Sequence, residues 1–206
     1  MYKRQVLKRE NVKKLFLLGV SSEDISSPWI QAGNLGALRD NRVEIYPYRH
    51  KPTRILLRYI PDNRSVQIQR GFFSNILHWK ELEKQNVAEW LFHLLEKPET
   101  KQVYVSIDKD CLTASHSLTN WEEGFLGLEE LLQLLHLIKT HLNIVGLDIV
   151  GDYSPPLVKG WGKAALARID RPKDYSAKGK PRLMIDAVNE RTNLAILDLL
   201  AGQSAN

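Results

Sequence analysis

Short apolar runs bounded by polar or turn-forming residues recur along the chain and predict β-strands. Runs of this length and composition are typical of strands buried in a sheet. Residues 61–63, Pro-Asp-Asn, predict a turn between two of these strands. The predicted strands comprise residues 14–20, 42–47, 55–60, 66–69, 103–108 and 143–150.

Longer segments place apolar residues at the spacing of a helix. Residues 74–96, 127–142 and 186–200 are therefore predicted to be helical, and Pro98 ends the first of these patterns. Residues 161–177 have no clean period and contain Gly, Pro and basic residues, which predicts an irregular surface loop. The last helix is expected to pack through Val188, Leu194, Ile196, Leu197 and Leu200.

The order of these elements predicts the fold class. The helix at 127–142 lies between two apolar strands and is long enough to be a crossover, so the two strands are expected to be parallel. We therefore expect an α/β protein with three layers, in which helices cover both faces of a mostly parallel sheet. A chain of 206 residues can bury this core as a single domain. We assign residues 14–206 to that domain and residues 1–13 to a charged lead-in of artificial origin.

Charge and cysteine content exclude several classes of protein. The net charge of +5 arises at the N-terminus, where the first fourteen residues contain six Lys or Arg and one Glu, so no nucleic-acid partner is expected. Cys111 is the single cysteine, which rules out an intramolecular disulfide and is typical of a reducing cytoplasm. No apolar run approaches the roughly 18 residues that span a bilayer. We expect a cytoplasmic protein with no membrane partner.

Two carboxylates follow the apolar strand 103–108. Ligands of parallel α/β sheets bind beyond the carboxyl ends of the strands, where Asp108 and Asp110 fall. Because side chains alternate along a strand, both carboxylates would face one spot and Lys109 the other. Oxygen ligands favour cations such as Mg²⁺, Ca²⁺ or Mn²⁺, and a pair of cations can activate water. The alternative is that the aspartates cap the next turn.

The wider stretch bears a family resemblance. SIDKDCL, the helix beginning GLEELL and the strand IVGLDIVGDYSP together resemble the ureohydrolases, the arginase and agmatinase group. LFLLGV extends the resemblance to about residues 14–200. The resemblance implies that Asp108 and Asp110 are ligands of a site for two Mn²⁺ ions. It further implies a metal-activated hydroxide that breaks a C–N bond of a small guanidino or amidino substrate, in a protein that can form homo-oligomers.

The segment after the aspartates departs from that family. Family members usually have Asp-Pro and then a Gly-Thr-rich loop, whereas residues 113–124 read TASHSLTNWEEG, closer to a divergent, arginase-like bacterial branch. We expect Asn120 and Glu122 to contact substrate and Trp121 to wall the pocket; the alternative is a packed loop anchored by Trp121. Where arginase has a Glu after the next strand, this chain has Gly151, followed by Asp152, a further candidate for substrate binding.

The family's histidine-bearing motifs have no counterpart in this sequence. Neither Gly-Gly-x-His nor Asp-Ala-His-x-Asp occurs, and thirteen residues precede the strand at 14–20. We therefore expect a C-terminal fragment that lacks the N-terminal part of the domain and is inactive alone. Two alternatives stay open: a degenerate, non-catalytic protein, and a deacetylase of the same broad fold. The pair Lys109-Asp110 disfavours the deacetylase, whose strand end resembles Asp-x-His.

Two further observations concern polar residues in apolar surroundings. Asp148 lies inside the strand 143–150, where an unpaired carboxylate would be costly, so it is expected to have a partner. His136 and His141 are five residues apart in a helix and do not share a face, which predicts surface or boundary positions.

Overall fold

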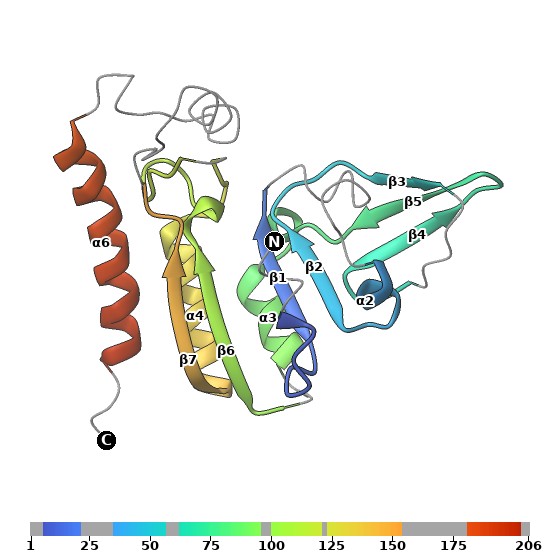
Figure 1. Cartoon of the computed structure of the whole chain (residues 1–206), viewed down its shortest axis with the longest axis horizontal. Coiled ribbons are helices and arrows are strands. Elements are labelled where there is room, and N and C mark those ends of the chain that lie inside the picture. Colours follow the sequence, from blue (N-terminus) through green and yellow to red (C-terminus); the bar gives the residue numbers. More distant parts are fainter. Residues whose placement is uncertain are drawn as a thin grey trace, which may run out of the picture. The chain divides into compact units, whose positions relative to one another are not determined.

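The chain forms two compact units. The computed structural model describes residues 6–21, 35–56, 62–95, 100–120, 123–153 and 181–202, which excludes the predicted loop at 161–177. The first unit is Met1–Asn86 and the second is Val87–Asn206 (Figure 1). Each unit contains parallel strands and helices, so the predicted α/β class is confirmed. None of the helices in the described ranges combines the length and apolarity that crossing a membrane requires.

A parallel pair of strands begins the first unit. β1 (Leu15–Val20) pairs with β2 (Val43–Pro47), and helix α2 (Leu35–Arg39) precedes β2. The register shifts between Leu18 and Val20, where Gly19 adopts a φ of 70° that other residues rarely tolerate. Both strands agree with the predicted ones to within a residue. Their apolar side chains form one cluster with the preceding segment, made up of Leu7, Ala37, Val43, Leu15, Leu17 and Ile45.

An antiparallel sheet follows, in the order β3 (Thr53–Leu56), β5 (Ser74–Trp79), β4 (Val66–Arg70). It encloses a second cluster formed by Leu38, Ile55, Val66 and Leu77. The predicted helix at 74–96 is therefore wrong over its first part. The structure has β5 there, then a 3₁₀ turn at Leu82–Lys84, and helix α3 only from Val87 to Leu95. As the central strand, β5 bonds to a neighbour on each side, and this pairing overrides an apolar spacing that also fits a helix.

The second unit contains the predicted crossover. β6 (Gln102–Asp108) and β7 (Asn143–Val150) are parallel, and α4 (Leu128–His141) connects them and packs against one face of the pair (Figure 1). These three elements match the prediction to within a residue. One correction concerns the layers: the strands of the described ranges form three small sheets, not one three-layer sheet. The side of α4 that faces the core is made of leucines, namely Leu128, Leu131, Leu134 and Leu135.

The last helix, α6 (Arg182–Ala201), begins four residues before the predicted start. Of the residues expected on its packing face, Ile196 is buried and Val188 packs in a core cluster, as predicted, whereas Leu194 and Leu197 are 52% and 49% exposed. The buried stripe joins apolar and polar residues at helical spacing: Ile185, Asn189, Thr192 and Ile196. Apolar residues alone did not predict this face, because Asn189 and Thr192 on it form hydrogen bonds to a loop, as described below.

A buried carboxylate in β2 organises the polar interior of the first unit. Glu44 is fully buried, forms an ion pair with Lys14 at 2.6 Å, and accepts a hydrogen bond from Tyr46 Oη at 2.7 Å. Arg64 Nε lies 3.1 Å from the same carboxylate. Burial alone would raise the pKa of Glu44, but the Lys14 and Tyr46 hydrogen bonds and the two cations outweigh it, so the pKa is lowered from 4.5.

Replacing this carboxylate tests the network. Because the folded-state pKa of Glu44 lies below 4.5, its stabilisation is complete above that pH and is lost as pH falls through the folded pKa. Glu44→Gln should lower the unfolding free energy at pH 7 by about 3 kcal/mol, since it removes the negative charge that pairs with the buried Lys14 ammonium. It should also flatten the acid limb of the stability curve. Chemical unfolding at pH 3 to 7 checks both effects, and exposed Asp40→Asn, the control, should change little.

Candidate functional site

The candidate site lies at the carboxyl end of β6. The strand ends at Asp108, and Lys109–Cys111 form a 3₁₀ turn, so Asp110 lies in the turn and the alternation of a strand does not extend to it. Asp108 Oδ1 accepts the backbone N–H of Asp110 at 3.4 Å, which is the capping contact of the alternative interpretation. This hydrogen bond involves Oδ1 of Asp108, so capping does not use both oxygens of the carboxylate.

The end of β7 comes close to this turn at Gly151. The residue has a φ of 89°, and a Cβ added there would lie 2.8 Å from Asp108 Oδ1 and 2.9 Å from Lys109 N. Real Cβ atoms do not approach so closely, and side chains rarely adopt this backbone conformation. The position at which arginase has a Glu therefore accepts only glycine here.

Lys109 is buried and links three segments. Its side chain is 0% exposed, and its ammonium forms an ion pair with Asp152, just beyond β7. It also donates a hydrogen bond to Asn193 Oδ1 of α6 at 2.9 Å. Asp152, a predicted substrate residue, is thus already the counterion of a lysine, although its side chain is 54% exposed.

The expected partner of Asp148 comes from the neighbouring strand. Tyr104 Oη donates to Asp148 Oδ2 at 2.8 Å, and Ser106 Oγ donates to Oδ1 at 2.7 Å. The bond to Asp148 is the main reason that the pKa of Tyr104 is raised. This trio joins β6 to β7 across the sheet, which confirms that Asp148 has a partner and gives it a structural role.

The segment after the aspartates is a loop whose two ends are bonded together. Leu126 N donates to Cys111 O at 3.0 Å, Gly124 N to Leu112 O at 3.1 Å, and Thr113 N to Leu126 O at 3.1 Å. A Cβ on Gly124 would lie 1.9 Å from Cys111 O, so glycine is required for this closure. The loop therefore leaves and rejoins the chain at one place beside the aspartate turn.

Helix α6 holds the body of this loop. The Asn189 side chain accepts from Leu118 N at 2.9 Å and donates to Leu118 O at 2.9 Å, and both groups are buried. Thr192 Oγ1 donates to His116 O. Leu118 also packs with Tyr153 and Ile185. Sequence reasoning missed Asn189 and Thr192; the signal was their position between Ile185 and Ile196 on one helix face.

The predicted substrate residues of the loop are placed only in part. Asn120 is 3% exposed and lies just after the segment that α6 holds. Trp121 and Glu122 lie outside the described residues. A packed loop, one of the two interpretations, agrees with the burial of Asn120.

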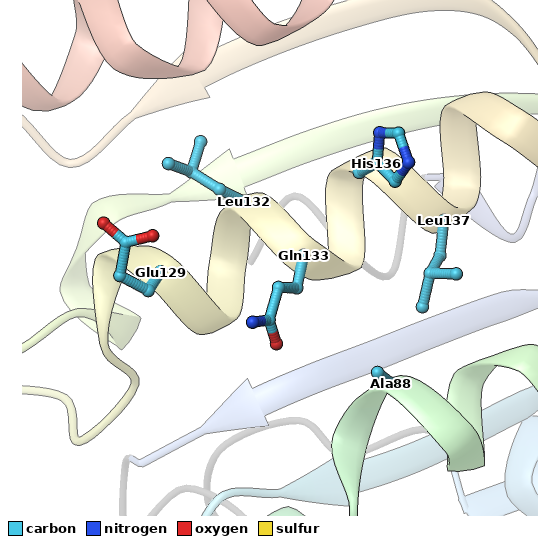
Figure 2. Close-up of a pocket in the computed structure, with 6 residues that line it drawn as sticks. All are labelled: Ala88, Glu129, Leu132, Gln133, His136 and Leu137. Carbon is cyan, nitrogen blue, oxygen red and sulfur yellow. The ribbon is translucent and has the colours of Figure 1, made fainter.

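Hollows lined by described residues include two in the second unit. One, of about 320 Å³, is lined by Asp152, Tyr153 and the half of α6 from Arg182 to Asn193, and there Arg182 lies over the Tyr153 ring at 5.3 Å and pairs with Asp186. A hollow of about 360 Å³ lies between α3 and α4, where Gln133 and Leu137 point toward Ala88 (Figure 2). The larger one contains none of the predicted site residues. The histidine that lines it, His136, is exposed, as predicted.

The metal-binding capacity of this site is limited to the aspartate pair. Asp110 Oδ1 is buried, and Asp110 also makes contacts of its own. Buried carboxylates are paired with a cation or a hydrogen-bond donor. However, no group of three or more His, Cys, Asp or Glu converges within the described ranges. Asp108 and Asp110 are the acidic residues that this turn offers, and within the described ranges no other potential metal ligand joins them.

The close approach at Gly151 makes a direct test. Gly151→Ala should destabilise the second unit by about 1–3 kcal/mol, because it imposes a strained φ and pushes Asp108 away. Gly127→Ala is the matched control: its φ of −75° suits any residue, and its Cβ would meet only the flexible Glu130 carboxylate, at 3.3 Å. Chemical unfolding compares the two variants. Equal losses would contradict the importance of the Gly151 contact.

The hydrogen bonds between α6 and the loop can be tested by substituting Asn189. Asn189→Ala leaves the buried N–H and C=O of Leu118 without partners and should cost about 3 kcal/mol of stability. The neighbouring Glu190 is exposed, and Glu190→Ala should change stability by less than about 0.5 kcal/mol. Thermal unfolding measures both, and hydrogen exchange of the Leu118 amide should accelerate only in the Asn189 variant. An unchanged exchange rate of the Leu118 amide would show that the loop keeps its conformation without the Asn189 hydrogen bonds.

Comparison with known protein families gives one match. The family model of the arginase family matches residues 57–169, more than half of the chain. This stretch includes the aspartate turn, the closed loop, α4 and β7. No curated protein matches the sequence significantly, and no solved structure does so either. The chain therefore belongs to the arginase family.

Proposed function

We propose that this protein takes part in the metal-dependent hydrolysis of a C–N bond in a guanidino or amidino substrate. The observation that carries the proposal is the placement of Asp108 and Asp110 at the carboxyl end of β6, within the stretch that matches the arginase family. Family membership supports a ureohydrolase-like reaction, and the carboxyl end of a parallel strand is where α/β proteins bind ligands.

In this proposal the two aspartates hold Mn²⁺. Carboxylate oxygens suit this ion, and the buried position of Asp110 Oδ1 supports a ligand role. When bound, the metal supplies an activated hydroxide for attack on the planar carbon of the substrate. The chain's own part is to hold the turn that carries both aspartates, where Gly151 leaves room for the Asp108 carboxylate. Because the described residues bring together no third ligand, we propose that the pair is one part of a larger ligand set.

Substrate contacts are assigned to the loop in this proposal. Asn120 and Glu122 belong to the segment that departs from the characterised ureohydrolases, so they are the candidates for recognising a different substrate. Asp152 is a weaker candidate, because its carboxylate already neutralises Lys109. With a glycine at 151, the acidic side chain that arginase places after this strand has no direct replacement.

A non-catalytic member of the family is the second candidate. The observation in its favour is that Asp108 and Asp110 are not joined by another potential ligand in the described part of the chain. Such a protein would keep the α/β units and bind Mn²⁺ weakly or not at all, because two carboxylates make an incomplete site.

Metal binding and hydrolysis together separate the two candidates. We expect the purified chain to bind Mn²⁺, and Asp108→Asn/Asp110→Asn to weaken binding by more than about 100-fold, since both proposed ligands lose their charge. Asp40→Asn/Asp62→Asn, which removes two exposed carboxylates, is the control and should leave binding unchanged. Calorimetric titration measures the affinities.

Hydrolysis is assayed as the release of urea, ammonium or amine from a panel of guanidino and amidino compounds. Activity that requires Mn²⁺ and both aspartates would support the proposal. An N-acetylated amine in the panel tests the deacetylase alternative. Binding that is negligible, or equal in the double variant and the unaltered chain, would reject the assigned site and favour the non-catalytic protein.

A further inference from the structure

Lys109 is a charged side chain in an unusual place. It stands between the two aspartates in the sequence, yet its side chain is fully buried. A buried ammonium is costly unless it is paired, and two acceptors satisfy this one: the carboxylate of Asp152 and the amide oxygen of Asn193. The ammonium therefore has a defined position and a defined direction.

The partners of Lys109 come from distant parts of the chain. Asp152 follows β7 and is 43 positions away, while Asn193 is in the middle of α6 and is 84 positions away. The backbone of the same residue is approached by Gly151 from the β7 end. The turn is thus held through its backbone at one point and through the Lys109 side chain at two others.

We propose that Lys109 is a positioning residue that fixes the turn carrying Asp108 and Asp110, and that Asp152 serves as its counterion and not as a ligand. The metal-related part of this inference rests on the proposed function. The turn ends with a hydrogen bond from Leu112 N to Lys109 O at 3.1 Å, so the anchored lysine determines how the peptide planes on either side of Asp110 are directed.

The sign of the effect on Mn²⁺ affinity separates this role from a purely electrostatic one. A lysine that acted only through its charge would repel a nearby cation, so its loss would tighten Mn²⁺ binding. If Asp152 were itself a ligand, loss of Lys109 would free it and tighten binding too. A positioning lysine predicts the opposite, because released aspartates coordinate the ion less well.

The experiment compares Lys109→Met with Lys139→Met in the full chain. Lys139 is a matched lysine of the same unit, whose ammonium binds the carbonyls of Leu199 and Leu200 at the end of α6. Lys109→Met should weaken Mn²⁺ binding by about 10-fold to 100-fold and accelerate hydrogen exchange of the Leu112 amide. The Leu142 amide, at the end of α4, should be unaffected. Lys139→Met should change neither the Mn²⁺ affinity nor the Leu112 amide.

The double variant Lys109→Met/Asp152→Asn tests the counterion role. Both single changes should weaken Mn²⁺ binding, and the combination should be no weaker than the weaker single variant, since both act through one pair. Tighter or unchanged binding in Lys109→Met would overturn the proposal. If that variant does not fold, Asn193→Ala removes one of the two acceptors and should produce the same changes to a smaller extent.

The amide measurement keeps this inference separate from the proposed function. If the unaltered chain binds no Mn²⁺, the proposed function fails for this chain, and exchange of the Leu112 amide alone decides the role of Lys109. Faster exchange in Lys109→Met, with the Leu142 amide unchanged, would support positioning of the turn. Unchanged exchange at Leu112 would overturn it.

Discussion

The turn after β6 keeps its shape because the backbone of Gly151 lies against it. This contact depends on the parallel pairing of β6 with β7, which brings the two strand ends to one edge, and on the crossover through α4, which makes that pairing possible. With no Cβ at residue 151, the Asp108 carboxylate and the Lys109 amide fit into space that a side chain would fill. This approach acts on the backbone of the turn, while Asp152 and Asn193 hold the Lys109 side chain and α6 holds the loop that follows.

The sequence alone predicts the bounds of those helices and strands whose apolar pattern fits one type of element. β1, β2, β6, α4 and β7 were predicted to within a residue, because their apolar runs are bounded by turn residues. The burial expected of β6 and β7 is incomplete, since Tyr104, Val145 and Val150 are 60%, 57% and 45% exposed. The central antiparallel strand was not, since its apolar spacing fits a helix as well as a strand and only its two neighbours decide between them. The order of the elements predicted one mostly parallel sheet covered by helices on both faces, whereas the described strands form smaller sheets.

Some features of the candidate site were likewise predicted from the sequence, and others were not. The location of Asp108 and Asp110 at a strand end followed from the apolar run before them, but the 3₁₀ turn in which Asp110 lies did not. The roles of Lys109 and Asn189 could not be predicted, because each depends on a partner more than 70 positions away. Asp148 shows an intermediate case: a carboxylate in an apolar strand required a partner, and only the register with β6 identified it as Tyr104 and Ser106.

The closure of the loop beside the aspartate turn makes the loop sequence independent of the position of the strand end. Because the loop leaves and returns at one bonded junction, formed by Cys111, Leu112, Thr113, Gly124 and Leu126, its interior can be lengthened, shortened or rewritten without moving the strand end that carries the carboxylates. The sequence of residues 113–124 can therefore change while Asp108 and Asp110 keep their place at the end of β6.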